Sequence, residues 1–237
     1  MQRPRFIAGG FYHIYNRGVE RRRTFLDDKD RLRFIHDLFE FNDRRPAPHM
    51  HFHYGGSTSV VEKERRGART PLVSLLAYAL MPNHYHLLVR ARESAAVPAF
   101  MRKLGTGYTM YFNERYARSG VLFQGRYQVR VVMEDRYLRH LVSYIHLNPI
   151  ALVASGWKEG EEIRDPEKAL RNLKTYRWSS LQDFLGEKNF SSVLNLELVR
   201  DLGIPLGTAQ MHGLREWLIE PVSYLDKIRD ATLDYGG

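Results

Sequence analysis

The sequence predicts an α+β fold in which helices pack on an antiparallel sheet. Segments with strand character and segments with apolar residues at helical spacing follow in the order strand, helix, strand, strand, helix, strand, helix. The second and third strands are separated only by the turn Pro82-Asn83, which favours an antiparallel pair. An antiparallel sheet with helices on one side, of the ferredoxin-like kind, accounts for this order.

Each element has a local signal. Phe11, His13 and Tyr15 alternate with their neighbours as on a half-buried strand, Asp27 or Asp28 suits a helix N-cap, and Pro149 stops a helix. The expected strands are 6–16, 71–81, 85–90 and 121–133, and the expected helices are 28–42, 94–118, 134–147 and 165–174. Gly105 and Gly107, inside the expected helix 94–118, either weaken that helix prediction or permit another segment to approach closely.

We expect the 237 residues to divide into a main domain, 1–186, and a helical C-terminal extension, 187–237. Residues 43–70 interrupt the main domain with prolines, glycines and charges, which predicts an insertion. His49, His51 and His53 alternate within it. They could form a second metal site, a DNA-contacting loop or a polar hairpin, of which the hairpin is favoured.

Composition narrows the function. Lys and Arg number 36 against 27 acidic residues, giving a net charge of +9, which favours a polyanionic partner such as nucleic acid. The absence of cysteine excludes disulfides, zinc-thiolate sites and thiol catalysis. No apolar run reaches the length of a membrane span, so we expect no membrane partner and a cytoplasmic, nucleoid-associated protein.

Two histidines stand on the strand that follows the Pro82-Asn83 turn. On a strand, residues i and i+2 point to one face, roughly 6.6 Å apart, so His84 and His86 can reach one ion while Tyr85 points away. Imidazole suits transition-metal ions better than magnesium. The spacing alone also fits two hydrogen-bonded structural histidines.

A second stretch supplies a nucleophile. Tyr144 and Asn148 lie one helical turn apart, just before Pro149. A phenol with an ordinary pKa of about 10 needs activation, and an ion that polarises a phosphate lowers that demand. Taken alone, Tyr144 also fits a packed surface tyrosine and Asn148 a C-terminal cap.

These stretches resemble a known family. The segment from Tyr78 to Val89 resembles the histidine-hydrophobe-histidine motif of the HUH single-tyrosine transposases, most closely the REP-associated tyrosine transposases, and the segment from Tyr144 to Pro149 resembles their nucleophile helix. Further similar motifs are Tyr12-His13-Ile14 with Asn16-Arg17-Gly18, Phe123-Gln124-Gly125-Arg126-Tyr127 and Tyr176-Arg177-Trp178-Ser179-Ser180. Tyr85 departs from the smaller aliphatic residue usual in the family, and we expect a local packing adjustment there.

The resemblance implies an HUH endonuclease core that cleaves and rejoins single-stranded DNA beside hairpins. It implies a 5′-phosphotyrosine link to Tyr144, a divalent ion (Mg or Mn) held by His84 and His86, and Asn148 as the third ligand. It also implies a monomer or a homodimer. The alternative is a hairpin-binding regulator that does not cut DNA; a rolling-circle replication initiator would usually carry further domains.

Basic residues near the motifs are candidates for contacts with DNA, because arginine binds phosphate in bidentate fashion. The candidates for DNA binding are Arg17, Arg126, Arg130 and Lys103. Arg17 and Arg126 are preferred, because each lies in one of the family-like motifs beside a strand end.

Overall fold

Four antiparallel strands form one sheet in the order β2-β3-β1-β4, in a computed structural model that describes residues 4–46, 68–159 and 161–219. The strands are β1 (Phe11–Arg17), β2 (Val73–Met81), β3 (His84–Ala91) and β4 (Gln128–Val132). The predicted α+β fold is confirmed, and this strand order is that of a ferredoxin-like sheet.

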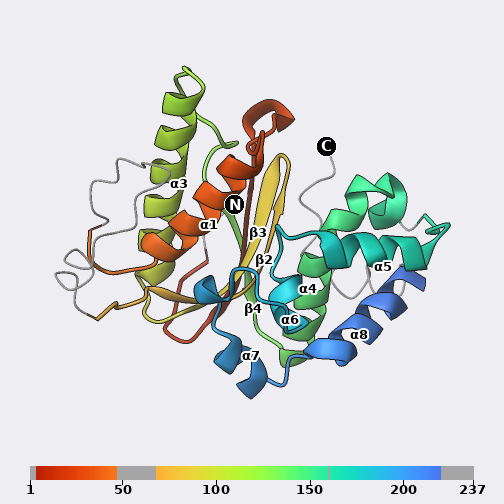
Figure 1. The fold of residues 1–237 in the computed structure, drawn as a ribbon. Coiled ribbons are helices and arrows are strands. Elements are labelled where there is room, and N and C mark those ends of the chain that lie inside the picture. Colours follow the sequence, from red (N-terminus) through yellow and green to blue (C-terminus); the bar gives the residue numbers. More distant parts are fainter. Residues whose placement is uncertain (1–3, 47–67, 160, 220–237) are drawn as a thin grey trace.

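Helices α1 (Asp28–Glu40) and α3 (Ala96–Arg115) cover one face of the sheet, as Figure 1 shows on the left of the view. The side chain of Asp27 accepts a hydrogen bond from the backbone NH of Asp30 at 3.1 Å, so Asp27 is the N-cap of α1. Tyr85 of β3 points to this face. Its ring packs against those of Phe34 and Phe123, with centroids 5.0 and 5.6 Å away, which is the packing that accommodates this large residue in the motif.

Helix α4 (Asp135–Leu147) covers the opposite face, with α5 (Pro166–Thr175), α6 (Leu181–Phe184) and α8 (Gly207–Ile219) packed around it (Figure 1). The expectation of helices on one side only was therefore wrong. The physical reason lies in β2. Every residue of this strand is buried, so both of its faces need a covering layer.

The chain between α3 and β4 is irregular. The expected strand 121–133 is reduced to β4, because Gly125 has a φ of +71° and turns the chain before the ladder begins. This segment is still held to the sheet, since the backbone NH of Gln124 donates to the carbonyl of Arg17 at 2.7 Å.

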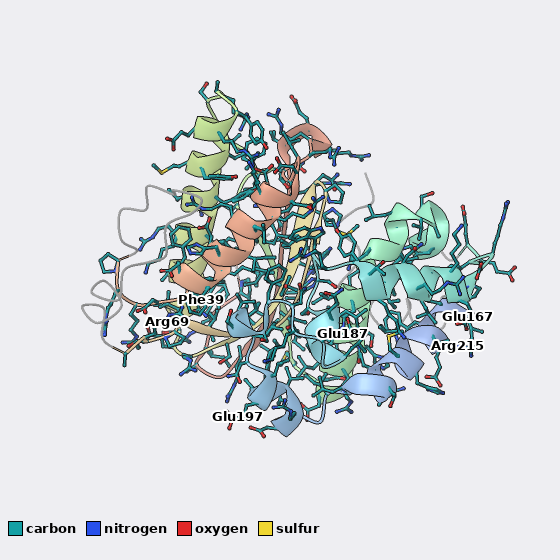
Figure 2. All side chains as sticks on the ribbon, viewed as in Figure 1. Phe39, Arg69, Glu167, Glu187, Glu197 and Arg215 are labelled. Carbon is teal, nitrogen blue, oxygen red and sulfur yellow. The ribbon has the colours of Figure 1, made fainter. Side chains whose placement is uncertain are left out.

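Short helices η2 (Asn148–Leu152), η3 (Ser155–Glu159) and α7 (Leu196–Asp201) lie on the α4 side, whereas η4 (Ser191–Val193) contacts α1, and its Val193 belongs to the buried cluster of the other face. Figure 2 labels Arg215 of α8 and Glu167 of α5, whose side chains form an ion pair at 2.8 Å. Trp217 and Leu218 of α8 belong to the same buried cluster as α4, so this part of the predicted C-terminal extension packs on the main domain. The boundary at residue 186 stays a prediction.

Some expectations lie outside the described residues. These include His49, His51 and His53, most of the predicted insertion 43–70, and the end of the chain after residue 219. Among the helices that are described, none combines the length and the apolar character that crossing a membrane requires.

Candidate active site

The sheet register gathers the candidate residues on the face covered by α4. Tyr15 lies opposite His86, and Arg17 lies opposite His84, in the β1–β3 ladder. Directly opposite residues of an antiparallel pair share a face, so side chains of β1 and β3 meet there. Leu88, two residues beyond His86, packs into the buried cluster of α4, which identifies the face.

His84 and His86 lie side by side on this face, as their spacing predicts. Their ring centroids are 5.2 Å apart and the rings are nearly perpendicular. His86 is fully buried, whereas His84 is half-buried at the strand end. The Nδ1 atom of His84 is 2.7 Å from the amide oxygen of Asn83.

His13 is a third histidine of the site, to which the sequence assigned no role. Its Nε2 atom is 2.9 Å from Nδ1 of His86, and the two rings are stacked at 17°. Both side chains are buried. The sequence places His13, Tyr15 and Arg17 on one face of β1. Only the strand order reveals that His86 of β3 is the neighbour of His13.

Tyr144 reaches the same place from α4. Its ring stands edge-on to that of His86, with centroids 5.8 Å apart, and lies 6.5 Å from the ring of His13. The ring of Trp157, from η3, lies 6.4 Å away on the helical side. Tyr144 is buried, and burial raises the pKa of its phenol well above the ordinary value. The phenol is therefore protonated in this arrangement.

Asn148 caps the helix that carries Tyr144. Its side-chain amide donates a hydrogen bond to the backbone carbonyl of Tyr144 at 2.9 Å, and the residue is fully buried. This bond uses the amide nitrogen and not the oxygen that a metal ion would need. Tyr144 and the expected third ligand are thus joined within one helical turn.

His146 fixes α4 to its surroundings. Its Nδ1 accepts from the amide of Gln210 in α8 at 3.1 Å, so its Nε2 donates to the hydroxyl of Ser180 at 2.8 Å. That hydroxyl in turn accepts from the backbone NH of Tyr78 in β2 at 3.0 Å. Burial lowers the pKa of His146 to about 3. A neutral histidine therefore links α4 to the sheet and to α8.

The four DNA-binding candidates divide into two groups. Arg17, beside His84, and Arg130, opposite His13 in the β1–β4 ladder, lie on the site face, and Arg126 is exposed in the turn before β4. Lys103 lies on α3, on the other side of the sheet, and donates to the backbone carbonyls of Asp43 and Arg45. These hydrogen bonds hold the chain that follows α1, and they explain the position of Lys103 without a contact to DNA.

The donors present suit a cation. Two imidazoles and one amide can serve a transition-metal ion and leave positions for a phosphate. Within residues 4–46, 68–159 and 161–219, no group of three or more His, Cys, Asp or Glu side chains is arranged to hold a metal. A two-histidine site completed by an amide oxygen does not need such a group.

Comparison with known proteins points the same way. Residues 57–148 match the family described as "Transposase IS200 like". The matched segment contains His84, His86, Tyr144 and Asn148, and the resemblance seen in the sequence is confirmed over it. No curated protein matches the chain.

Solved structures that this chain resembles include the following two. One is a REP-associated tyrosine transposase bound to a REP hairpin, with 15% sequence identity and a TM-score of 0.48, covering 82% of this chain and 90% of that chain. The other is the tRNA(His) guanylyltransferase of Saccharomyces cerevisiae, with 8% identity and a TM-score of 0.34, covering 86% of this chain and 82% of that chain.

Proposed function

We propose that this chain, which carries an IS200-like transposase segment, is a metal-dependent transposase of single-stranded DNA. It cleaves and rejoins DNA beside a hairpin, and Tyr144 forms a 5′-phosphotyrosine intermediate. His84, His86 and Asn148 hold a divalent ion, Mg or Mn.

One observation carries the proposal. Residues far apart in the sequence, His86 on β3 and Tyr144 on α4, face each other with ring centroids 5.8 Å apart. A buried tyrosine against a histidine pair is also compatible with packing. The match of this same segment to a transposase family favours the catalytic explanation.

The chemistry assigned to each residue follows from its position. The phenol oxygen of Tyr144 attacks phosphorus and loses its proton; the new O–P bond forms while the bond to the 3′ oxygen breaks, and that oxygen leaves as a hydroxyl. A bound divalent ion would polarise the phosphate and stabilise the charge that develops on it. Rejoining is the reverse reaction, with a 3′ hydroxyl as the attacking group.

The burial of Tyr144 sets a condition on this chemistry. A protonated phenol with a raised pKa is a weak nucleophile, and a side chain that is 1% exposed cannot touch a strand of DNA. α4 or the neighbouring η3, which carries Trp157, must therefore shift when DNA binds. In this proposal, the described arrangement is the form of the site before DNA binds.

Arginines beside the site provide a path for the DNA backbone. Arg17 on β1 lies opposite His84, and Arg130 on β4 lies opposite His13. Arg126 is exposed in the turn before β4. Guanidinium groups bind phosphate in bidentate fashion and position a strand without reading its sequence. We assign these three arginines to the DNA strand that enters the site.

A covalent adduct tests the proposal. The protein is incubated with end-labelled hairpin oligonucleotides carrying single-stranded flanks and Mn²⁺, and the products are separated on a denaturing gel. The wild-type protein should give a protein–DNA adduct. Tyr144→Phe should abolish it and His84→Ala should nearly abolish it, whereas Tyr137→Phe, on the same helix, should retain it.

The outcomes discriminate between functions. An adduct that survives Tyr144→Phe refutes this nucleophile. Tight hairpin binding without an adduct, across hairpins of many sequences, favours a regulator that binds DNA without cutting it.

A further inference from the structure

The contact between His13 and His86 joins two buried imidazoles from neighbouring strands. The two residues are 73 positions apart in the sequence, and their facing nitrogens are 2.9 Å apart. Both side chains have no measurable exposure, and their ring centroids are 5.1 Å apart. Tyr15 packs against both rings, at 5.2 and 5.9 Å, and restrains their planes.

The position of one proton decides what this contact does. A hydrogen bond between two ring nitrogens needs one N–H, and a buried neutral pair can supply it in two ways. If His13 donates, His86 carries its proton on Nε2 and has no lone pair there for a metal. If His86 donates from Nδ1, its Nε2 keeps the lone pair.

The neighbouring histidine, His84, shows the arrangement that leaves an Nε2 lone pair for a metal. Nδ1 of His84 is 2.7 Å from the side-chain oxygen of Asn83. An amide oxygen only accepts, so His84 must donate from Nδ1 and present the lone pair of Nε2. The orientation of Asn83 is supported by its amide nitrogen, which donates to the carbonyl of Arg21 at 3.2 Å.

We propose that His13 is a positioning residue that accepts the Nδ1 proton of His86 and so holds Nε2 of His86 ready for the metal, as Asn83 does for His84. This inference rests on the proposed metal site. Nε2 of His13 faces His86 at 2.9 Å, so this nitrogen serves His86 rather than the ion. Ligand histidines in metal sites commonly donate their second N–H to such an acceptor.

Histidine tautomers in the metal-free protein test the inference directly. Long-range ¹⁵N–¹H spectra distinguish Nδ1-protonated from Nε2-protonated rings, and His86→Gln identifies the signals of His86. We expect His86 to carry its proton on Nδ1 in the wild-type protein. In His13→Phe, which fills the space without an acceptor, we expect a mixture of tautomers.

Metal affinity gives a second measurement, by calorimetric titration with Mn²⁺. His13→Phe should weaken Mn²⁺ binding about 10–100-fold. His13→Gln, whose amide oxygen can accept the same proton, should recover part of that loss. A purely structural role for His13 would not produce this rescue at equal thermal stability.

Three results overturn the inference. They are a wild-type His86 protonated on Nε2, an unchanged Mn²⁺ affinity in a folded His13→Phe, and equal losses in His13→Phe and His13→Gln. If a variant fails to fold, the wild-type spectrum still decides the tautomer. Failure of the proposed function is a different result, namely no adduct with DNA while the tautomer and the Mn²⁺ affinity are as expected.

Discussion

Lowering the pH should weaken the anchoring of α4 through His146. This side chain is buried between Ser180 and Gln210, and its pKa in the folded protein is lowered to about 3 from an ordinary value of 6.5. The unfolded chain therefore binds a proton as the pH falls through 6.5, while the folded protein does not. The stability that neutral His146 contributes is complete above about pH 6.5 and is lost progressively towards pH 3.

The size of the effect follows from the two pKa values. On going from pH 8 to pH 5, only the unfolded chain takes up this proton over about the last 1.5 pH units, below its pKa of 6.5. Each of these units lowers the free energy of unfolding by about 1.4 kcal/mol. We therefore expect His146 alone to lower the free energy of unfolding by about 2 kcal/mol at pH 5. For a protein of this size that is a large share of the total stability.

Urea unfolding at pH 8 and pH 5, in the presence of a chelator, measures this difference. Other histidines also titrate, so the comparison is between the wild-type protein and His146→Gln, which lacks the titrating group. The wild-type protein should lose about 2 kcal/mol more than this variant. His212→Gln, at an exposed site on α8, should behave like the wild type. Equal losses in the wild type and His146→Gln would refute the assignment of a buried, neutral His146.

Two matched pairs of substitutions test packing and DNA contact. Gly107→Ala should lower the free energy of unfolding by about 1–3 kcal/mol, because a Cβ there would lie 2.4 Å from the Phe41 ring. Gly105→Ala, with no atom within 4 Å of the added Cβ, should raise the free energy of unfolding by about 0.5–1 kcal/mol. Denaturant titrations measure both changes. Changes of the same sign would contradict the close contact between Gly107 and Phe41. Arg17→Ala should reduce the salt dependence of single-stranded DNA binding by about one phosphate contact, measured by fluorescence anisotropy at several salt concentrations. Lys103→Met should leave the salt dependence unchanged. An equal reduction in both variants would show that Lys103 also contacts DNA.

Much of the fold was accessible from the sequence because its signals are local. The alternation on β1, the turn at Pro82-Asn83 and the stop at Pro149 each depend on a few neighbouring residues, and they predicted elements close to those observed. The same holds within the site for pairs on one element. The spacing of His84 and His86 determines that they share a face, whatever the strand pairs with.

What the sequence could not supply depends on pairing between distant segments. The role of His13 requires that β1 lie beside β3 in one particular register, and no local pattern specifies that register. The second helical layer was missed for a related reason. A run of apolar residues such as β2 is compatible with several kinds of cover, and only the assembled sheet shows that both its faces are packed.

The distance of His13 from His86 along the chain also bears on how the site forms. The loop between them must close before their hydrogen bond exists, and non-local contacts of this kind form slowly. Its equilibrium cost grows only with the logarithm of its length, so residues 43–70, which lengthen it by less than a factor of two, add under about 0.6 kcal/mol. The chain can therefore carry a long connection there at little expense to the site. If the proposed metal site is correct, the affinity for Mn²⁺ would rise to its full value during refolding only once β1 has docked on β3, which makes metal binding a reporter of this non-local pairing.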